Sequence, residues 1–196
     1  MNNIGRIKND LRGYLSEYRF FHCLRVAYVA RRLADVYHYD MDKAYVAGLI
    51  HDIAKEFSNE ENMDVIMKYH LSKSLLDDDY SKLLHSDIGA CLAKNVYGLD
   101  DDVCHAVMCH TIGDIPMNLL DKILFVADKI EPGKDYMGIE EERELAYKDI
   151  NEATILCIEN HHKKLVKTKK KIYPKSLDVL NYLKKERSEY KLVNEK

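Results

Sequence analysis

Apolar residues recur every three or four positions along most of the chain, and this helical period is the strongest constraint on its fold. Between 19 and 38 the period is carried by Cys23, Val26, Ala27, Ala30, Leu33, Ala34 and Tyr37. No stretch shows the sustained alternation of a strand, and only three prolines and eight glycines interrupt 196 residues. The sequence therefore predicts an all-α fold.

The same period locates the expected helices. We expect a first helix broken near 16–19, and further helices over 19–38, 44–50 with Asp42 as a cap, 59–69, 83–96, 100–110 and 117–129. One long helix is expected from Ile139 to about Leu165, and Pro174 falls in the first turn of a last helix. The length suits one domain over 1–196, with a core over about 19–136 and C-terminal helices over 139–186 packing on it.

Charge and cysteine usage exclude several classes of protein. The 30 basic and 33 acidic side chains give a net charge of −3, which provides no overall attraction to nucleic acid or membrane. No apolar run approaches the roughly 20 residues needed to span a bilayer, and MNNIGRIKND at the start lacks a signal-peptide core. Five cysteines without a CxxC spacing argue against a disulfide framework. We therefore expect a cytoplasmic protein.

One segment has a biased composition, the lysine-rich KKLVKTKKK at about 163–171. A solvated helix end and connector is the plainer interpretation of such a charge run. A patch that attracts phosphate is the alternative.

Four histidines and two aspartates fall on the buried side of their expected helices. The six residues are His22, His51, Asp52, His85, His110 and Asp128. His51 and Asp52 follow the apolar run AGLI, for example, and Asp128 follows the run ILFVA. Charged groups are rarely buried unless they are paired or bound to a metal.

Each of these residues alone could be a capped carboxylate or a histidine that bonds to a carbonyl. Six of them on five or six helices are explained together if they converge on metal. Imidazole nitrogens and carboxylate oxygens suit iron, manganese or zinc. Six protein ligands exceed what one catalytic metal with open positions uses, and they suit two metals that share a bridging carboxylate.

The order His…His-Asp…His…His…Asp on a helical scaffold resembles the HD-domain phosphohydrolase superfamily, with His51-Asp52 as the adjacent pair. Five motifs are similar to the YqeK-type family of symmetrical diadenosine tetraphosphate hydrolases. They are RFFHCLRVAYVARRLA at 19–34, AGLIHDIAK at 47–55, LLHSDIGA at 83–90, HTIG at 110–113 and ADKIEPGKDY at 127–136. The resemblance implies an HD-domain helical bundle.

The resemblance also implies a function and a set of ligands. One metal would be held by His22, His51, Asp52 and Asp128, and a second by His85 and His110 with Asp52 as the bridge. The expected enzyme is a metal-dependent hydrolase that cuts diadenosine tetraphosphate into two ADP molecules with a hydroxide activated by both metals. Iron is the expected metal, with manganese or zinc as alternatives.

Two cations near these ligands are candidates for phosphate binding. Lys55 lies one turn past Asp52 and could neutralise a phosphoryl oxygen, as a catalytic or a substrate-binding residue; its plain role is that of a lysine at a helix C-terminus. Arg19 lies three residues before His22 and shares its face, although a surface salt bridge explains it equally well.

Three further residues are expected to contact the substrate. Thr111 and Gly113 could let the backbone approach it, or could simply end a helix. Lys134 stands where the family carries an arginine, and a lysine cannot reproduce the bidentate phosphate contact of an arginine.

Other functions remain open from the sequence. Another HD hydrolase acting on mononucleotides or alarmones would use the same metals with different pocket walls. A di-iron oxygenase would use the same ligands with oxygen, and a binding module would keep the fold without catalysis. The expected partner is a small nucleotide, with no nucleic acid polymer and no membrane, and a homodimer is one option for assembly.

Overall fold

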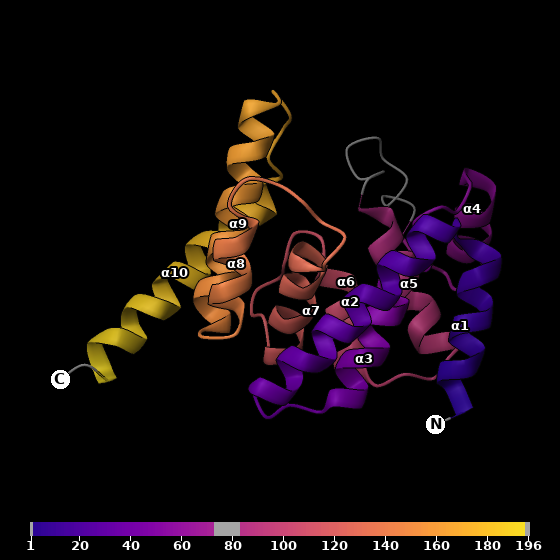
Figure 1. Cartoon of the computed structure of the whole chain (residues 1–196). Helices are drawn as coiled ribbons and strands as arrows, with labels where there is room; N and C mark the ends of the chain where they lie inside the picture. The colour runs from indigo at the N-terminus through magenta and orange to yellow at the C-terminus, as the bar shows by residue number, and fades with distance from the viewer. Residues whose placement is uncertain (1, 73–82, 195–196) are drawn as a thin grey trace.

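The computed structural model describes residues 2–72 and 83–194, and these residues form helices joined by turns and short connections (Figure 1). The helices are α1 (Asn2–Tyr14), α2 (Glu17–Val36), α3 (Met41–Ile50), α4 (Asn59–Lys68), α5 (Leu84–Asn95), α6 (Asp101–Cys109), α7 (Leu119–Ile130), α8 (Ile139–Ala146), α9 (Ile150–Lys167) and α10 (Pro174–Asn194). No strand occurs in the described part of the chain. The prediction of an all-α fold is confirmed.

Helix α7 lies at the centre of the arrangement, where it contacts α2, α3, α6, α8 and α9. Its residues Ile123, Leu124 and Phe125 are at most 2% exposed, and burying each such side chain contributes about 1.5–3 kcal/mol. Helices α8 to α10 lie on one side of α7, and α1 and α4 lie at the far side of the molecule (Figure 1). Helix α7 therefore lies next to helices from both the first and the last parts of the chain.

Helices α2 and α3 pack unusually closely because glycine stands at their contact. A Cβ atom added at Gly48 would lie 2.5 Å from the Cα of Ala27, which is shorter than a real contact allows. The close approach holds His22 on α2 beside His51 at the end of α3.

A Gly48→Ala substitution should therefore destabilise the protein by about 1–3 kcal/mol, since the obstructing atoms belong to backbone and the two helices must separate. Thermal unfolding of the variant measures this. Gly5→Ala is the matched control, because nothing lies within 4 Å of a Cβ built there. Equal melting temperatures for the two variants would contradict the argument.

The expected long helix from Ile139 to about Leu165 is wrong, because α8 ends at Ala146 and α9 begins at Ile150. The Asp149 side chain caps α9 by accepting hydrogen bonds from the backbone N–H groups of Asn151 and Glu152. Its other oxygen pairs with Arg187 of α10 at 2.7 Å. Apolar spacing continues across this break, so the period did not reveal it.

The cap of α3 also differs from the prediction. Asp40, not Asp42, accepts the hydrogen bonds from the first N–H groups of the helix, which starts at Met41. Within the described residues, no helix has both the length and the apolar character that crossing a membrane requires.

Candidate metal centre

The structure brings all six predicted ligands together where five helices meet. His22 lies in α2, His51 and Asp52 directly follow α3, His85 opens α5, His110 follows α6, and Asp128 lies near the end of α7. The four histidines and Asp52 are at most 6% exposed. Polar side chains converge here at a depth where unpaired charges are costly.

The carboxylate of Asp52 lies between two pairs of histidines. Its Oδ2 is 3.7 Å from His22 Nε2 and 3.5 Å from His51 Nε2. Its Oδ1 is 3.3 Å from His85 Nε2 and 3.6 Å from His110 Nε2, and these two ring nitrogens are 3.3 Å apart. Each oxygen of one carboxylate therefore faces a separate pair of nitrogen donors.

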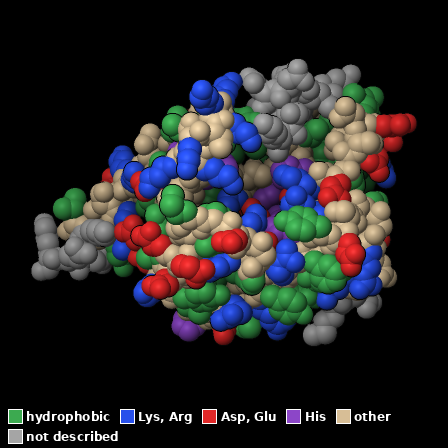
Figure 2. All heavy atoms as spheres, turned by 45° about the horizontal axis from the view of Figure 1, so that its top comes forward, with side chains coloured by type: hydrophobic (Ala, Val, Ile, Leu, Met, Phe, Trp, Pro, Cys, Tyr) green, Lys and Arg blue, Asp and Glu red, His purple; other side chains and the backbone are tan. Residues whose placement is uncertain are grey.

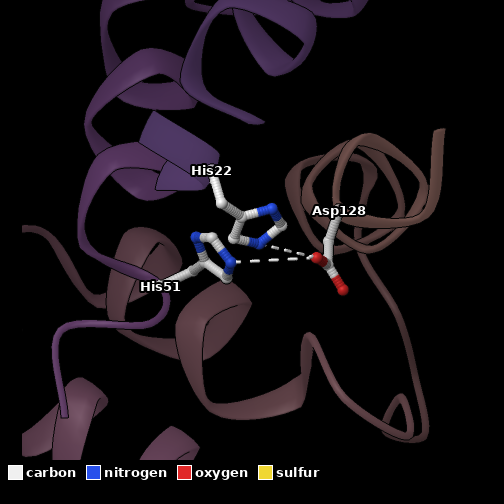
Figure 3. A group of neighbouring side chains, drawn as sticks. All are labelled: His22, His51 and Asp128. Carbon is white, nitrogen blue, oxygen red and sulfur yellow. Dashed lines mark ion pairs between the residues drawn. The ribbon is translucent and has the colours of Figure 1, made fainter. Parts of the chain in front are cut away.

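Asp128 completes the group of potential ligands around His22 and His51 (Figure 3). Its Oδ1 lies 3.2 Å from His22 Nε2 and 3.9 Å from His51 Nε2. One ligand atom each from His22, His51 and Asp128 can lie within 4.8 Å of one another, which is close enough to surround one cation.

The hydrogen bonds of the rings aim lone pairs into this centre. The Nδ1 of His51 donates to the carbonyl of Gly48 at 2.8 Å, and that of His110 donates to the carbonyl of Val107 at 2.6 Å. In a neutral imidazole the second nitrogen, Nε2, then carries a lone pair. The Nε2 atoms of His22 and His51 are buried without a hydrogen-bond partner, and a cation would satisfy them.

The electrostatics of the site give two of the histidines and both aspartates the protonation states that metal ligands need. His22 differs, because burial would lower its pKa but its hydrogen bonds to Asp128 and Glu131 outweigh burial and raise it. Burial lowers the pKa of His51 to about 3 and that of His85 to about 4, so both rings are neutral near pH 7. Burial also opposes ionisation of Asp52, but the surrounding histidines outweigh it and hold its pKa well below the usual value. The pKa of Asp128 is likewise low, since Lys129 outweighs the effect of burial. Neutral imidazoles and ionised carboxylates are the forms that bind metal, so the residues present fit a metal site.

Glu131 is a partner of this site that the sequence interpretation missed. It is fully buried, and its Oε1 lies 3.1 Å from His22 Nδ1 while its Oε2 accepts from Arg25 Nε at 2.5 Å. Burial alone would raise its pKa, but the hydrogen bonds from His22 and Arg25 lower it to about 2. Glu131 comes three residues after Asp128 in the sequence, but it directly precedes Pro132 and Gly133, where an exposed turn is expected.

A Glu131→Gln variant should bind metal about 10–100-fold more weakly with the fold intact, because carboxylates behind a ligating histidine fix its orientation and raise its basicity. Metal titration followed by elemental analysis measures the change. Glu144→Gln, at a side chain that is 74% exposed, is the matched control. If Glu131→Gln bound metal with the affinity of the wild type, the charge of Glu131 would not be needed to orient His22.

A cavity of about 690 Å³ opens over the centre and reaches both Asp52 and Asp128. Its wall carries the cationic side chains of Arg19, Lys55, Lys129, Lys134, Lys170 and Lys171. Figure 2 shows histidine side chains at the floor of a hollow whose surroundings carry Lys and Arg. The cavity therefore combines possible metal ligands with an excess of positive charge.

Four of the predicted substrate contacts line this cavity, namely Arg19, Lys55, Thr111 and Lys134. Arg19 Nη1 donates to Asp52 Oδ2 at 2.8 Å, and Lys55 Nζ lies 3.1 Å from His85 Nε2. Lys134 Nζ lies 3.6 Å from Asp128 Oδ1. Each of these three cations touches a candidate metal ligand.

The fifth predicted contact, Gly113, is not among the residues that line the cavity. It is buried in the left-handed region at φ +83°, and a Cβ there would lie 2.7 Å from Val179 Cγ1 of α10. Gly113 therefore serves the turn after α6 and the packing of α10. Lys129 and Tyr173 line the cavity without having been predicted, and Lys170 of the lysine-rich segment lines it as well.

A second group of potential ligands, His105, Cys109 and Asp121, lies elsewhere between α6 and α7. Asp121 accepts from the backbone N–H of Asn118 at the start of α7, and its Oδ2 lies 3.0 Å from His105 Nδ1. These contacts cap a helix and pair the histidine, so this group needs no metal.

The chain is similar to a known domain family and to proteins from two bacteria. The family model for the HD domain matches residues 19–133. The symmetrical bis(5'-nucleosyl)-tetraphosphatase of Bacillus subtilis is 35% identical over 170 residues, which cover 86% of this chain and 91% of that protein. The protein of the same description from Halalkalibacterium halodurans is 35% identical over 182 residues, with coverage of 92% and 97%.

One solved structure is similar to this chain over nearly its whole length. It is described as a predicted HD superfamily hydrolase involved in NAD metabolism from Clostridium acetobutylicum. The two chains share 35% identity and a TM-score of 0.84, over 93% of this chain and 97% of the other. The helical arrangement described above is therefore also that of an experimentally determined relative.

Proposed function

The chain belongs to the HD domain family, and on this premise we propose that it is a metal-dependent hydrolase that cuts diadenosine tetraphosphate symmetrically into two ADP molecules. The observation that carries the proposal is the carboxylate of Asp52 between two histidine pairs, at the floor of a cavity lined by cations. Relatives named for this reaction match nearly the whole chain, which supports the substrate.

Two metal ions fit the donor set. His22, His51, Asp128 and the Oδ2 atom of Asp52 would hold the first. His85, His110 and Asp52 Oδ1 would hold the second. We propose iron, because nitrogen and oxygen donors without thiolate suit it, although they also suit manganese and zinc. Such a pair of ions, when bound, makes water a better nucleophile and neutralises phosphoryl oxygens.

The protein's own residues bind and orient the substrate. A tetraphosphate chain carries several negative charges, and Arg19, Lys55, Lys129 and Lys134 surround the place where it would meet Asp52 and Asp128. Lys134 acts here as a point charge, in contrast to the two-pronged contact of an arginine. The cavity volume of about 690 Å³ lies within the range of small-ligand sites.

The reaction consumes one water molecule. The bond between a central phosphorus and the oxygen that bridges the two middle phosphates breaks, and the water oxygen joins that phosphorus. The other half leaves with the bridging oxygen, so both products are ADP. Lys129 and Lys134 flank Asp128 and would stabilise the charge that develops on the departing phosphate.

Chromatography of the products tests the proposal. Protein purified without oxygen and loaded with iron should convert diadenosine tetraphosphate into ADP alone. Equal amounts of ATP and AMP would overturn symmetrical cleavage. Faster turnover of mononucleotides or alarmones would show that another HD phosphohydrolase reaction is the main one.

A further inference from the structure

A second cavity of about 520 Å³ adjoins the one over the metal centre. The two cavities share Lys129, Lys134 and His161 in their walls. The remaining lining comes from the segment between α7 and α8, from Glu142 of α8 and from α9. Besides Glu142 it consists of Tyr136, Met137, Cys157, Asn160, Lys163, Lys164 and Lys167. The residues proposed above to bind phosphate all line the first cavity.

The second cavity offers an apolar surface at its edge. Met137 is 92% exposed, the largest exposed fraction among the large apolar residues of the described chain. Tyr136 lies beside it, held in place because its hydroxyl donates to Glu142 and lies 3.2 Å from the carbonyl oxygen of Lys129. A fixed aromatic ring and a flexible thioether together form a surface on which a nucleobase can stack.

The opposite wall is cationic. Lys163, Lys164 and Lys167 project from the last turns of α9, and all three are exposed. Lys163 donates to the amide of Asn160 at 3.2 Å, and none of the three ammonium groups has a carboxylate partner in the described parts of the chain. Unneutralised lysines around a concave surface attract phosphate.

The single carboxylate in this wall is already engaged. Glu142 is 1% exposed, and its oxygens accept from Tyr136 and from Asn160 at 2.9 Å. It therefore does not offset the five lysines that surround the cavity. An apolar platform facing several ammonium groups suits a nucleoside diphosphate better than an uncharged metabolite.

We infer that the second cavity binds one of the two nucleoside diphosphate halves of the dinucleotide, while the first cavity binds the other half. This inference rests on the proposed function. The two middle phosphates would cross the shared wall at Lys129 and Lys134, both of which contact Asp128. Two adjoining cavities of about 690 and 520 Å³ that share this wall would then explain why the cut falls between the two halves.

The inference also assigns a role to the lysine-rich segment 163–171. Its first part supplies Lys163, Lys164 and Lys167 to the second cavity, and its last part supplies Lys170 and Lys171 to the first. We therefore adopt the interpretation of this segment that attracts phosphate, although its lysines are also exposed to solvent at the end of α9.

The test replaces the cationic wall of the second cavity. The triple variant Lys163→Ala/Lys164→Ala/Lys167→Ala should raise the KM for diadenosine tetraphosphate at least about tenfold, since several phosphate contacts are lost. Its metal content should remain that of the wild type. The control Lys94→Ala/Lys148→Ala/Lys185→Ala removes the same charge at side chains that are 53%, 70% and 77% exposed and lie outside both cavities.

Equilibrium dialysis with ADP provides a readout that does not depend on turnover. The metal-loaded wild type and the control should bind two ADP molecules per chain, and the triple variant should bind one. Efficient conversion to ADP by the triple variant, with an unchanged KM, would overturn the second subsite and leave the proposed function standing. Two bound ADP molecules without hydrolysis of the dinucleotide would keep the subsite and overturn the proposed function.

Discussion

An Asp52→Asn variant should lose hydrolysis of diadenosine tetraphosphate by roughly 10³-fold or more while remaining folded. The two oxygens of Asp52 face separate histidine pairs, with Oδ2 toward His51 and Oδ1 toward His85. An amide keeps the shape of the side chain but offers one oxygen and no charge. Its NH₂ group would also point its hydrogens at the histidine nitrogens, where a cation would otherwise bind.

The measurement combines single-turnover rates with metal analysis of the variant. Asp42→Asn is a suitable control, because the Asp42 side chain is 70% exposed and lies outside the centre. The Asp52→Asn variant should have a melting temperature close to that of the wild type, since the volume of the side chain is unchanged. Near-normal turnover in a folded, metal-loaded Asp52→Asn protein would exclude the bridging role.

The positions of the six candidate ligands could be predicted because each residue carries a local signal. His51 and Asp52 extend an apolar run at the end of a helix, and Asp128 does the same in α7. A polar residue on the buried face of an amphipathic helix is visible in the sequence itself. The structure shows that all six of these signals meet at one place.

The partners of these ligands carried no comparable signal. Glu131 precedes a proline and a glycine, where an exposed turn is expected, and only the fold shows that it is buried against His22 and Arg25. The break between α8 and α9 depends on Asp149, which is anchored by Arg187 from a helix much later in the chain. Contacts between distant segments decide both features, and helical period does not encode such contacts.

The two cavities depend on tertiary structure in the same way. The second one forms between the segment after α7 and the last turns of α9, which are separated by about 30 residues in the sequence. A run of lysines is most often a solvated helix end. Only its position beside the candidate metal centre distinguishes this run from an ordinary one.

Replacing both His85 and His110 with alanine should remove about one metal ion per chain and leave the first ion bound. Their Nε2 atoms are 3.3 Å apart and both face Asp52 Oδ1. His22 and His51 keep their own contacts to Asp52 Oδ2, so the first group of ligands is unaffected. Two divalent ions per wild-type chain and one per variant chain is the expected result.

The same variant should hydrolyse the dinucleotide slower by several orders of magnitude, because one cation alone cannot both activate water and stabilise the leaving oxygen. Binding of the dinucleotide should weaken much less, since Arg19, Lys129 and Lys134 remain in the wall of the cavity. The control His38→Gly/His70→Gly removes two histidines at positive φ, where glycine is tolerated. If the fold collapses without both rings, His85→Gln/His110→Gln preserves more of the packing and addresses the same question. An unchanged ratio of metal to protein in a folded double variant would mean that these histidines only pack, and the mechanism with two metals would have to be abandoned.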